Sequence, residues 1–245
     1  MIFFRAIDNV KIACESILET MMFEQKPTIE RRGESILATN KVLRNTYFLL
    51  ALTLVFSALT ASYAMATQVA PLNPILTLVV YFVLLFATQA LRNSVWGLVL
   101  VFALTGFLGY TIGPILNYYI TAFSNGNELI MMALGSTGVV FFVLSAIAMT
   151  TKRDFTNMGT LLFAGAIVVL VAVVANLFLK LPALALAISI VLALISAGYI
   201  LYTTNMIVRG GENNYISATV MLYVSLLNIF LTLLQLFGMF AGNRD

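Results

Sequence analysis

The chain has 245 residues, of which 61% are hydrophobic and only 9% are charged, and its net charge is +3 at pH 7. A soluble domain carries about 25% charged residues, so the composition excludes a soluble globular protein and predicts an integral membrane protein. The chain has no histidine and one cysteine, Cys14, which excludes His-based catalysis, internal disulfides and Cys/His metal sites. We therefore expect no enzyme activity, no catalytic residue, no metal or cofactor, and no nucleic-acid partner.

Residues 1–44 are predicted to form a cytoplasmic N-terminal tail with two parts. Residues 1–22 place apolar residues at helical intervals among mixed charges, which is typical of a helix on a membrane surface. The alternative is an extension of little consequence, included upstream of a true start at Met21 or Met22. Residues 24–41, EQKPTIERRGESILATNK, are polar and charged, and this composition predicts a mobile segment.

Residues 45–241 are predicted to form one membrane domain of seven helices. Each apolar run has about the 17–25 residues needed to span a bilayer, and short links rich in Pro, Gly and polar residues separate the runs. The fold class is therefore all-α, a bundle in which consecutive helices are antiparallel neighbours. The predicted helices are Tyr47–Thr67, Ile75–Leu91, Val95–Thr121, Leu129–Met149, Met158–Leu179, Pro182–Val208 and Tyr215–Phe240.

The distribution of basic residues predicts the orientation in the membrane, because cytoplasmic links carry an excess of Lys and Arg. Seven basic residues precede the first predicted helix. Arg92, Lys152, Arg153 and Arg209 lie in links on the same side, so eleven of the thirteen basic residues share one side. This places the N-terminus in the cytoplasm and the C-terminus outside.

No acidic or basic residue lies near the middle of a predicted helix. The ten acids fall in the tail, the links and the C-terminus. Proton relays and cation transporters usually depend on ionisable groups inside the membrane, so a proton-coupled transporter is disfavoured. A pore lined by hydroxyls or carbonyls is not excluded by this pattern.

Polar side chains recur along one face of the last predicted helix. Ser225, Asn228, Thr232 and Gln235 follow one another at steps of three, four and three, which places them on one helix face. Polar groups at membrane depth must face protein or water. Two interpretations stay open: hydrogen bonding between helices, or the lining of an interior path. Thr203, Thr204 and Asn205 form a second polar group near the cytoplasmic end of the sixth helix.

The third predicted helix carries Gly106, Gly109 and Gly113 followed by Pro114. Small residues at this spacing let neighbouring helices approach closely, and a proline commonly bends a helix. We favour tight packing with a kink, and the alternative is a hinge that opens a cavity.

Several of these segments resemble the Bax inhibitor family. The matching blocks are KVLRNTYFLL at 41–50, TGFLGYTIGPILNYY at 105–119, ALGSTGVVFF at 133–142, TKRDFTNMGTLL at 151–162 and NNYISATVMLYVSLLNIF at 213–230. Within the family the chain is most similar to the proteobacterial branch described as modulators of the FtsH protease. The resemblance runs from about Thr39 to Phe237 and implies a seven-helix bundle whose last helix is surrounded by the other six.

Relatives that act as pH-sensitive calcium leaks carry a pair of aspartates, one on each of the last two helices. The matching positions are Thr203, in Tyr202-Thr203-Thr204-Asn205, and Ser225, in Leu222-Tyr223-Val224-Ser225-Leu226. Hydroxyl groups do not titrate between pH 5 and 8, so a switch based on this pair is absent. We expect Thr203 and Ser225 to be able to hydrogen-bond to each other. The alternative function is a calcium or cation leak that lacks this switch.

The branch resemblance implies a bacterial inner-membrane protein that binds a membrane-anchored, ATP-dependent protease of the FtsH type and its associated inner-membrane factors. Such a protein limits the degradation of other membrane proteins. A processive protease needs an exposed segment to seize, and the tail offers one in the residues Lys26, Pro27, Arg31, Arg32 and Glu34.

Overall fold

The computed structural model describes residues 27–151 and 153–242, with side chains from residue 41 onward within those ranges. These residues form helices joined by short links, with no strand among them. The helices are α2 (Pro27–Ala66), α3 (Pro74–Ala90), α4 (Val95–Ala122), α5 (Gly126–Thr150), α6 (Met158–Leu179), α7 (Pro182–Val208) and α8 (Tyr215–Gly242). The predicted all-α bundle of seven helices is therefore confirmed.

Local residues explain where several helices begin or end. The Asn73 side chain accepts a hydrogen bond from the backbone N–H of Ile75 at 2.9 Å, with Pro74 in the first turn of α3. The Ser94 hydroxyl accepts one from the N–H of Trp96 at the start of α4. Such caps satisfy donors that have no partner within the helix. At the end of α6, Lys180 adopts a left-handed conformation (φ 52°), and Pro182 then starts α7.

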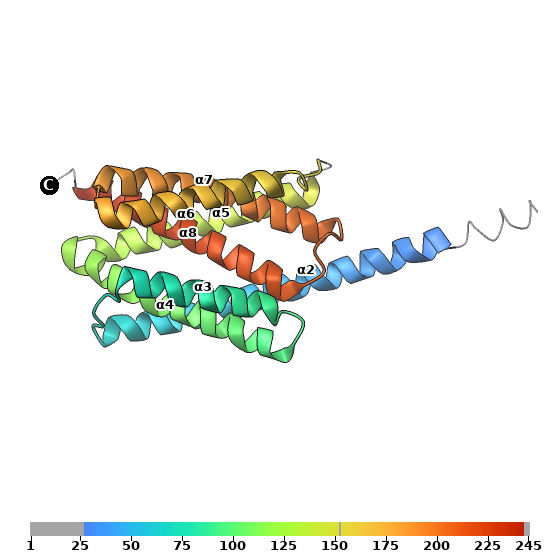
Figure 1. Cartoon of the computed structure of the whole chain (residues 1–245), viewed down its shortest axis with the longest axis horizontal. Coiled ribbons are helices and arrows are strands. Elements are labelled where there is room, and N and C mark those ends of the chain that lie inside the picture. Colours follow the sequence, from blue (N-terminus) through green and yellow to red (C-terminus); the bar gives the residue numbers. More distant parts are fainter. Residues whose placement is uncertain (1–26, 152, 243–245) are drawn as a thin grey trace, which may run out of the picture.

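The first helix differs from the prediction for the tail. We expected residues 24–41 to be mobile, but α2 is helical from Pro27, and Figure 1 shows it extending beyond the ends of the other helices. A proline suits the first turn of a helix, and the Glu, Arg, Ala and Leu residues that follow are good helix formers. Residues 1–22 lie outside the described residues.

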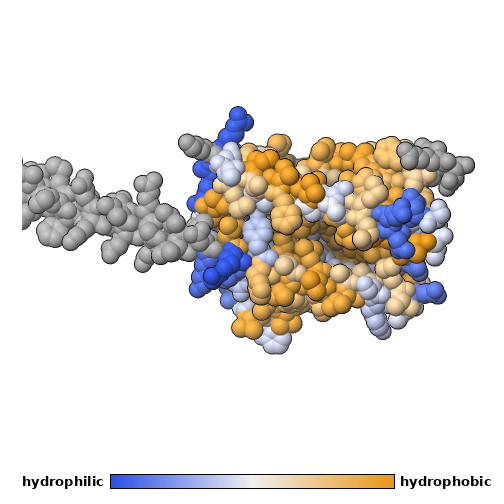
Figure 2. Space-filling view, turned by 180° about the vertical axis from the view of Figure 1, so that it is seen from behind, coloured by the Kyte–Doolittle hydropathy of each residue, from blue (hydrophilic) through white to orange (hydrophobic). Residues whose placement is uncertain are grey.

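Six of the described helices are long and apolar enough to cross a membrane, and α3, with 17 residues, is shorter. At about 1.5 Å per residue α3 is near 25 Å long, at the lower limit for a span. Figure 2 shows hydrophobic side chains over the middle of one face of the bundle and hydrophilic ones at its two ends. Large apolar residues such as Phe86, Val168 and Leu194 are more than 60% exposed. This surface is suited to lipid, and the chain is a multi-pass membrane protein.

Helix α8 runs between two groups of helices, one of α2, α3 and α4 and the other of α5, α6 and α7 (Figure 1). It packs most extensively against α7, α5 and α2 and has the largest buried share of the six long spans. Helix α6, however, packs mainly against α7, and α3 mainly against α4. A last helix surrounded by all six others is thus not confirmed.

Candidate functional site

The polar stripe of α8 faces α7. The Asn228 side-chain amide donates to the Ser196 hydroxyl at 3.2 Å, and the Thr232 hydroxyl donates to the carbonyl of Ser189 at 2.9 Å. Ser196 and Ser189 both lie on α7, and Gln235 is half-buried further along α8. These contacts are hydrogen bonds between helices, one of the two interpretations that the spacing left open.

Thr203 and Ser225, at the positions of the missing aspartates, are buried but do not bond to each other. The Ser225 hydroxyl donates to the backbone carbonyl of Met221 at 2.8 Å, within α8. The Thr203 hydroxyl instead contacts the Met221 sulfur at 3.9 Å. The Thr203–Ser225 hydrogen bond considered from the sequence is therefore not formed, and both hydroxyls contact Met221 instead. The neighbouring Thr204 hydroxyl lies 3.5 Å from the Tyr47 hydroxyl of α2.

Asn205 joins the link between α5 and α6 to the end of α7. Its side chain is 1% exposed. The amide oxygen accepts from the Phe155 N–H at 3.2 Å, and the amide nitrogen donates to the carbonyls of Ala148 at 3.3 Å and Arg153 at 3.4 Å. One buried amide thus satisfies three backbone groups that lie in this link or at the end of α5. We define these contacts as the Asn205 clamp.

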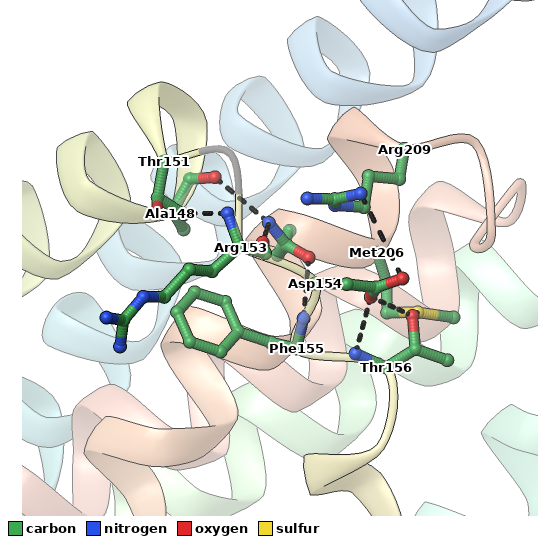
Figure 3. Close-up of polar contacts among 9 residues, drawn as sticks. Ala148, Thr151, Arg153, Asp154, Phe155, Thr156, Met206 and Arg209 are labelled. Carbon is green, nitrogen blue, oxygen red and sulfur yellow. Dashed lines mark hydrogen bonds and ion pairs between the residues drawn. The ribbon is translucent and has the colours of Figure 1, made fainter.

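Beside the clamp, Asp154 and Thr156 stabilise the same link, as Figure 3 shows. Asp154 accepts from the Thr156 hydroxyl at 2.6 Å and from its N–H at 2.9 Å, and it forms an ion pair with Arg209 at 3.9 Å. The hydrogen bonds from the Thr156 side chain and backbone, followed by the charge of Arg209, hold the pKa of the Asp154 carboxyl below its usual value of 3.8. The Arg153 side chain points away from this group (Figure 3).

Asn214 makes a corresponding connection at the start of α8. Its side-chain oxygen accepts from the N–H groups of Ile216 and Ser217 at 3.0 and 3.1 Å. Its nitrogen donates to the Arg92 carbonyl at 3.0 Å and to the Asn93 side chain at 2.8 Å. The links at residues 91–94, 151–157 and 209–214 are therefore held together at one end of the bundle, which we call the basic end. No pattern in the sequence had indicated that Asp154 and Asn214 join these links, because Arg209, Arg92 and Asn93, their partners in the other links, are distant in the chain.

We predict that Asn214→Ala lowers the free energy of unfolding by about 1–2 kcal/mol, as expected for the loss of a helix cap. Asn214→Asp keeps the acceptor for Ile216 and Ser217 but removes the donor to Arg92 and Asn93. Unfolding in mixed micelles, followed by circular dichroism, should therefore show a smaller loss for Asn214→Asp. Equal losses would mean that the cap contributes nothing.

The pKa of Asp154 leads to a prediction about pH. A carboxyl whose pKa is lowered in the folded protein stabilises the fold above its unfolded pKa, and that contribution is lost as the pH falls through the lower folded value. The contribution of Asp154 is therefore complete between pH 5 and 8. We expect Asp154→Asn to raise the rate of hydrogen exchange at residues 153–159 roughly twofold relative to the parent, as for the loss of a weak exposed ion pair. This factor should be the same at pH 5.5 and at pH 7.5. A factor that changes between these pH values would contradict the assignment.

The glycines of α4 lie against α2. A Cβ added at Gly106 would lie 2.6 Å from the Phe56 ring, and one at Gly113 would lie 2.5 Å from the Ala64 Cβ. At Gly109 it would collide with the Ser57 carbonyl and the Thr60 hydroxyl. These contacts agree with close helix packing. Pro114 lies inside α4, which continues to Ala122, and its role as a hinge stays a prediction.

The predicted protease handle lies at the edge of the described chain. Lys26 is outside the described residues, and Pro27, Arg31, Arg32 and Glu34 lie in the first turns of α2. Among the described residues no group of three or more His, Cys, Asp or Glu side chains is arranged to hold a metal ion. The chemistry that this site offers is hydrogen bonding between helices and links.

Comparison with known proteins agrees with this architecture. The profile of the family described as "Inhibitor of apoptosis-promoting Bax1" matches residues 39–242, which include every helix after the N-terminal part of α2. The chain belongs to the Bax inhibitor family. This confirms the family resemblance found in the sequence.

Among the relatives of this Bax inhibitor family protein is one named "Modulator of FtsH protease YccA" from Escherichia coli K12. It is 53% identical over 211 residues, which cover 86% of this chain and 94% of the relative. The protein named "Inner membrane protein YccA" from another E. coli strain matches equally well. An uncharacterized membrane protein of Vibrio cholerae is 46% identical over 230 residues, covering 92% of this chain and all of the relative.

Proposed function

We propose that this protein binds a membrane-anchored, ATP-dependent protease of the FtsH type in the bacterial inner membrane and slows the removal of other membrane proteins. The observation that carries the proposal is the 53% identity to the relative named as an FtsH modulator, across 94% of that relative. The basic end, with Arg92, Arg153 and Arg209 in its links, faces the cytoplasm in this proposal, and so does the N-terminus.

The extension of α2 beyond the bundle supports a proposal for how the protease engages this protein. The helix continues from the bundle into the segment that starts at Pro27 (Figure 1). An isolated helical segment of this length is only marginally stable in water, so a processive protease can unfold it readily. The bundle behind it is connected by the Asn205 clamp, by Asn214 and by the α2–α4 contacts. A substrate that is seized easily and extracted slowly occupies the protease and so inhibits it.

The test is affinity capture of the tagged protein from gently solubilised membranes, followed by identification of the captured proteins. We expect the protease to be captured with the full chain and much less with a variant that lacks residues 1–38. That variant should still insert, because α2 retains its membrane part, and should have a longer lifetime in cells. Capture of the bundle without the protease, under conditions that keep the protease's own assemblies intact, would contradict the proposal. The alternative function, a calcium or cation leak, would then be tested by measuring calcium flux in liposomes.

A further inference from the structure

A buried hydroxyl network joins α2, α4 and α8 near the middle of the bundle. Tyr223 of α8 is 1% exposed. Its hydroxyl lies 2.6 Å from the Ser57 hydroxyl of α2 and donates to the Thr105 carbonyl of α4 at 3.2 Å. Because the only proton of the Tyr223 hydroxyl goes to Thr105, Ser57 is the donor in the shorter bond. This one side chain therefore connects three helices.

The same part of α2 makes the closest approach to α4. Gly109 follows Thr105 by one helical turn and faces Ser57 and Thr60, so that even a methyl group would meet backbone oxygen. One turn further, Gly113 lies against Ala61 and Ala64. A flexible side chain could rotate away from an added Cβ, whereas backbone oxygen can move only if the two helices separate. We call the contacts of Ser57, Thr105, Gly109, Gly113 and Tyr223 the α2 seam.

The position of the seam matters for any protease that pulls on the N-terminus. The pulled chain leads directly into α2, so α2 has to separate from α4 and α8 before any later helix can leave. The contacts between α6 and α7 lie across α8 from α2 and α4 (Figure 1) and stay intact during this first step. The free energy that holds α2 in the seam is therefore the first barrier to extraction.

We propose that the α2 seam, through the Tyr223–Ser57 hydrogen bond and the Gly109 contact, sets the rate at which an N-terminally engaged protease extracts this protein. The inference rests on the proposed function, and it identifies the contacts that make extraction by the protease slow. A chain with a weaker seam is extracted sooner and occupies the protease for a shorter time. The same chain is then a poorer modulator although it binds the protease equally well.

The experiment measures degradation of the full chain in liposomes that contain a membrane-anchored FtsH-type protease and ATP. Tyr223→Phe removes the bonds to Ser57 and Thr105, and its control, Ser196→Ala, removes a buried hydroxyl that connects only α7 and α8. Gly109→Ala opens the seam, and its control, Gly198→Ala, places a methyl group against Leu162 between α7 and α6. Thermal unfolding midpoints of all four variants are measured in detergent.

We expect the half-life to fall about eightfold for Tyr223→Phe, as for the loss of two average hydrogen bonds between membrane helices, and about tenfold for Gly109→Ala, as for an overpacked core. The half-lives of the two control variants should stay within about twofold of the half-life of the parent. This should hold even for a control whose thermal unfolding midpoint falls as far as that of the seam variant that it matches. Half-lives that follow the midpoints irrespective of position would overturn the proposal, because global stability would then control extraction.

The outcome separates this proposal from the proposed function. If the protease binds the parent and all variants equally and degrades them at one rate, the seam proposal fails and binding stands. If the parent is neither bound nor degraded, both fail.

Discussion

Replacing Asn205 by alanine is expected to lower the free energy of unfolding by about 2–4 kcal/mol, one of the two largest effects that we predict for a change in this chain. The side chain is 1% exposed and satisfies the N–H of Phe155 and the carbonyls of Ala148 and Arg153. Removing one partner of a buried hydrogen bond costs the desolvation of the group left behind, about 1–3 kcal/mol each, reduced where water can enter.

Asn176 provides the matched control for this prediction. Its side chain also accepts from a backbone N–H, that of Leu181 at 3.1 Å, but this contact is exposed at the end of α6. Water can replace it, so Asn176→Ala should cost about 1 kcal/mol. Unfolding in mixed micelles gives both values, and hydrogen exchange at residues 153–157 should rise only for Asn205→Ala. Equal destabilisation by the two substitutions would show that the clamp does not hold the link.

The second large effect is expected when Thr203→Asp and Ser225→Asp are combined. Both side chains are less than 5% exposed, and burial penalises a charged carboxylate by several kcal/mol. A carboxyl that resists ionisation in the folded state favours folding at low pH and loses this advantage as the pH rises. The double variant should therefore unfold at a clearly lower temperature at pH 8 than at pH 5. The parent, with no titrating pair at these positions, should change little.

The control for the double variant is Thr203→Asn with Ser225→Asn, which has nearly the same shape but cannot ionise. Thermal unfolding of the three proteins at pH 5 and pH 8 tests the stability, and calcium flux in liposomes tests the function. We expect pH-dependent flux only in the Asp variant, because charged carboxylates draw water and cations into the bundle. Flux in the parent would favour the leak, and a pH response in the Asn variant would show that shape, not charge, is responsible.

Several features of this protein could be predicted from its sequence because they depend on neighbouring residues alone. The starts of α4, α6, α7 and α8 lie at Val95, Met158, Pro182 and Tyr215, as predicted from the apolar runs. Apolar length decides whether a segment suits the membrane, and Pro, Gly and Asn in the links interrupt the helix locally. The family was also predicted correctly.

The start of α2 was not predicted, because a polar, charged composition is compatible with either a mobile tail or an exposed helix. Local composition favoured the first, but the helix formers after Pro27 extend the membrane helix outward. Once a helix exists, each added residue costs far less than starting a new one.

Only the tertiary structure decided the partners of the polar side chains. The spacing of Ser225, Asn228 and Thr232 indicated a shared helix face, but periodicity does not say which helix lies opposite, and here it is α7. Asn205 was grouped with Thr203 and Thr204 as a polar group near the end of the sixth helix, and its partners are backbone groups of a link about 50 residues earlier in the chain. The sequence by itself determined that these polar groups must be satisfied, since the membrane offers them no water. The packing of the helices determined which partner satisfies each one, because that depends on distances between segments far apart in the chain.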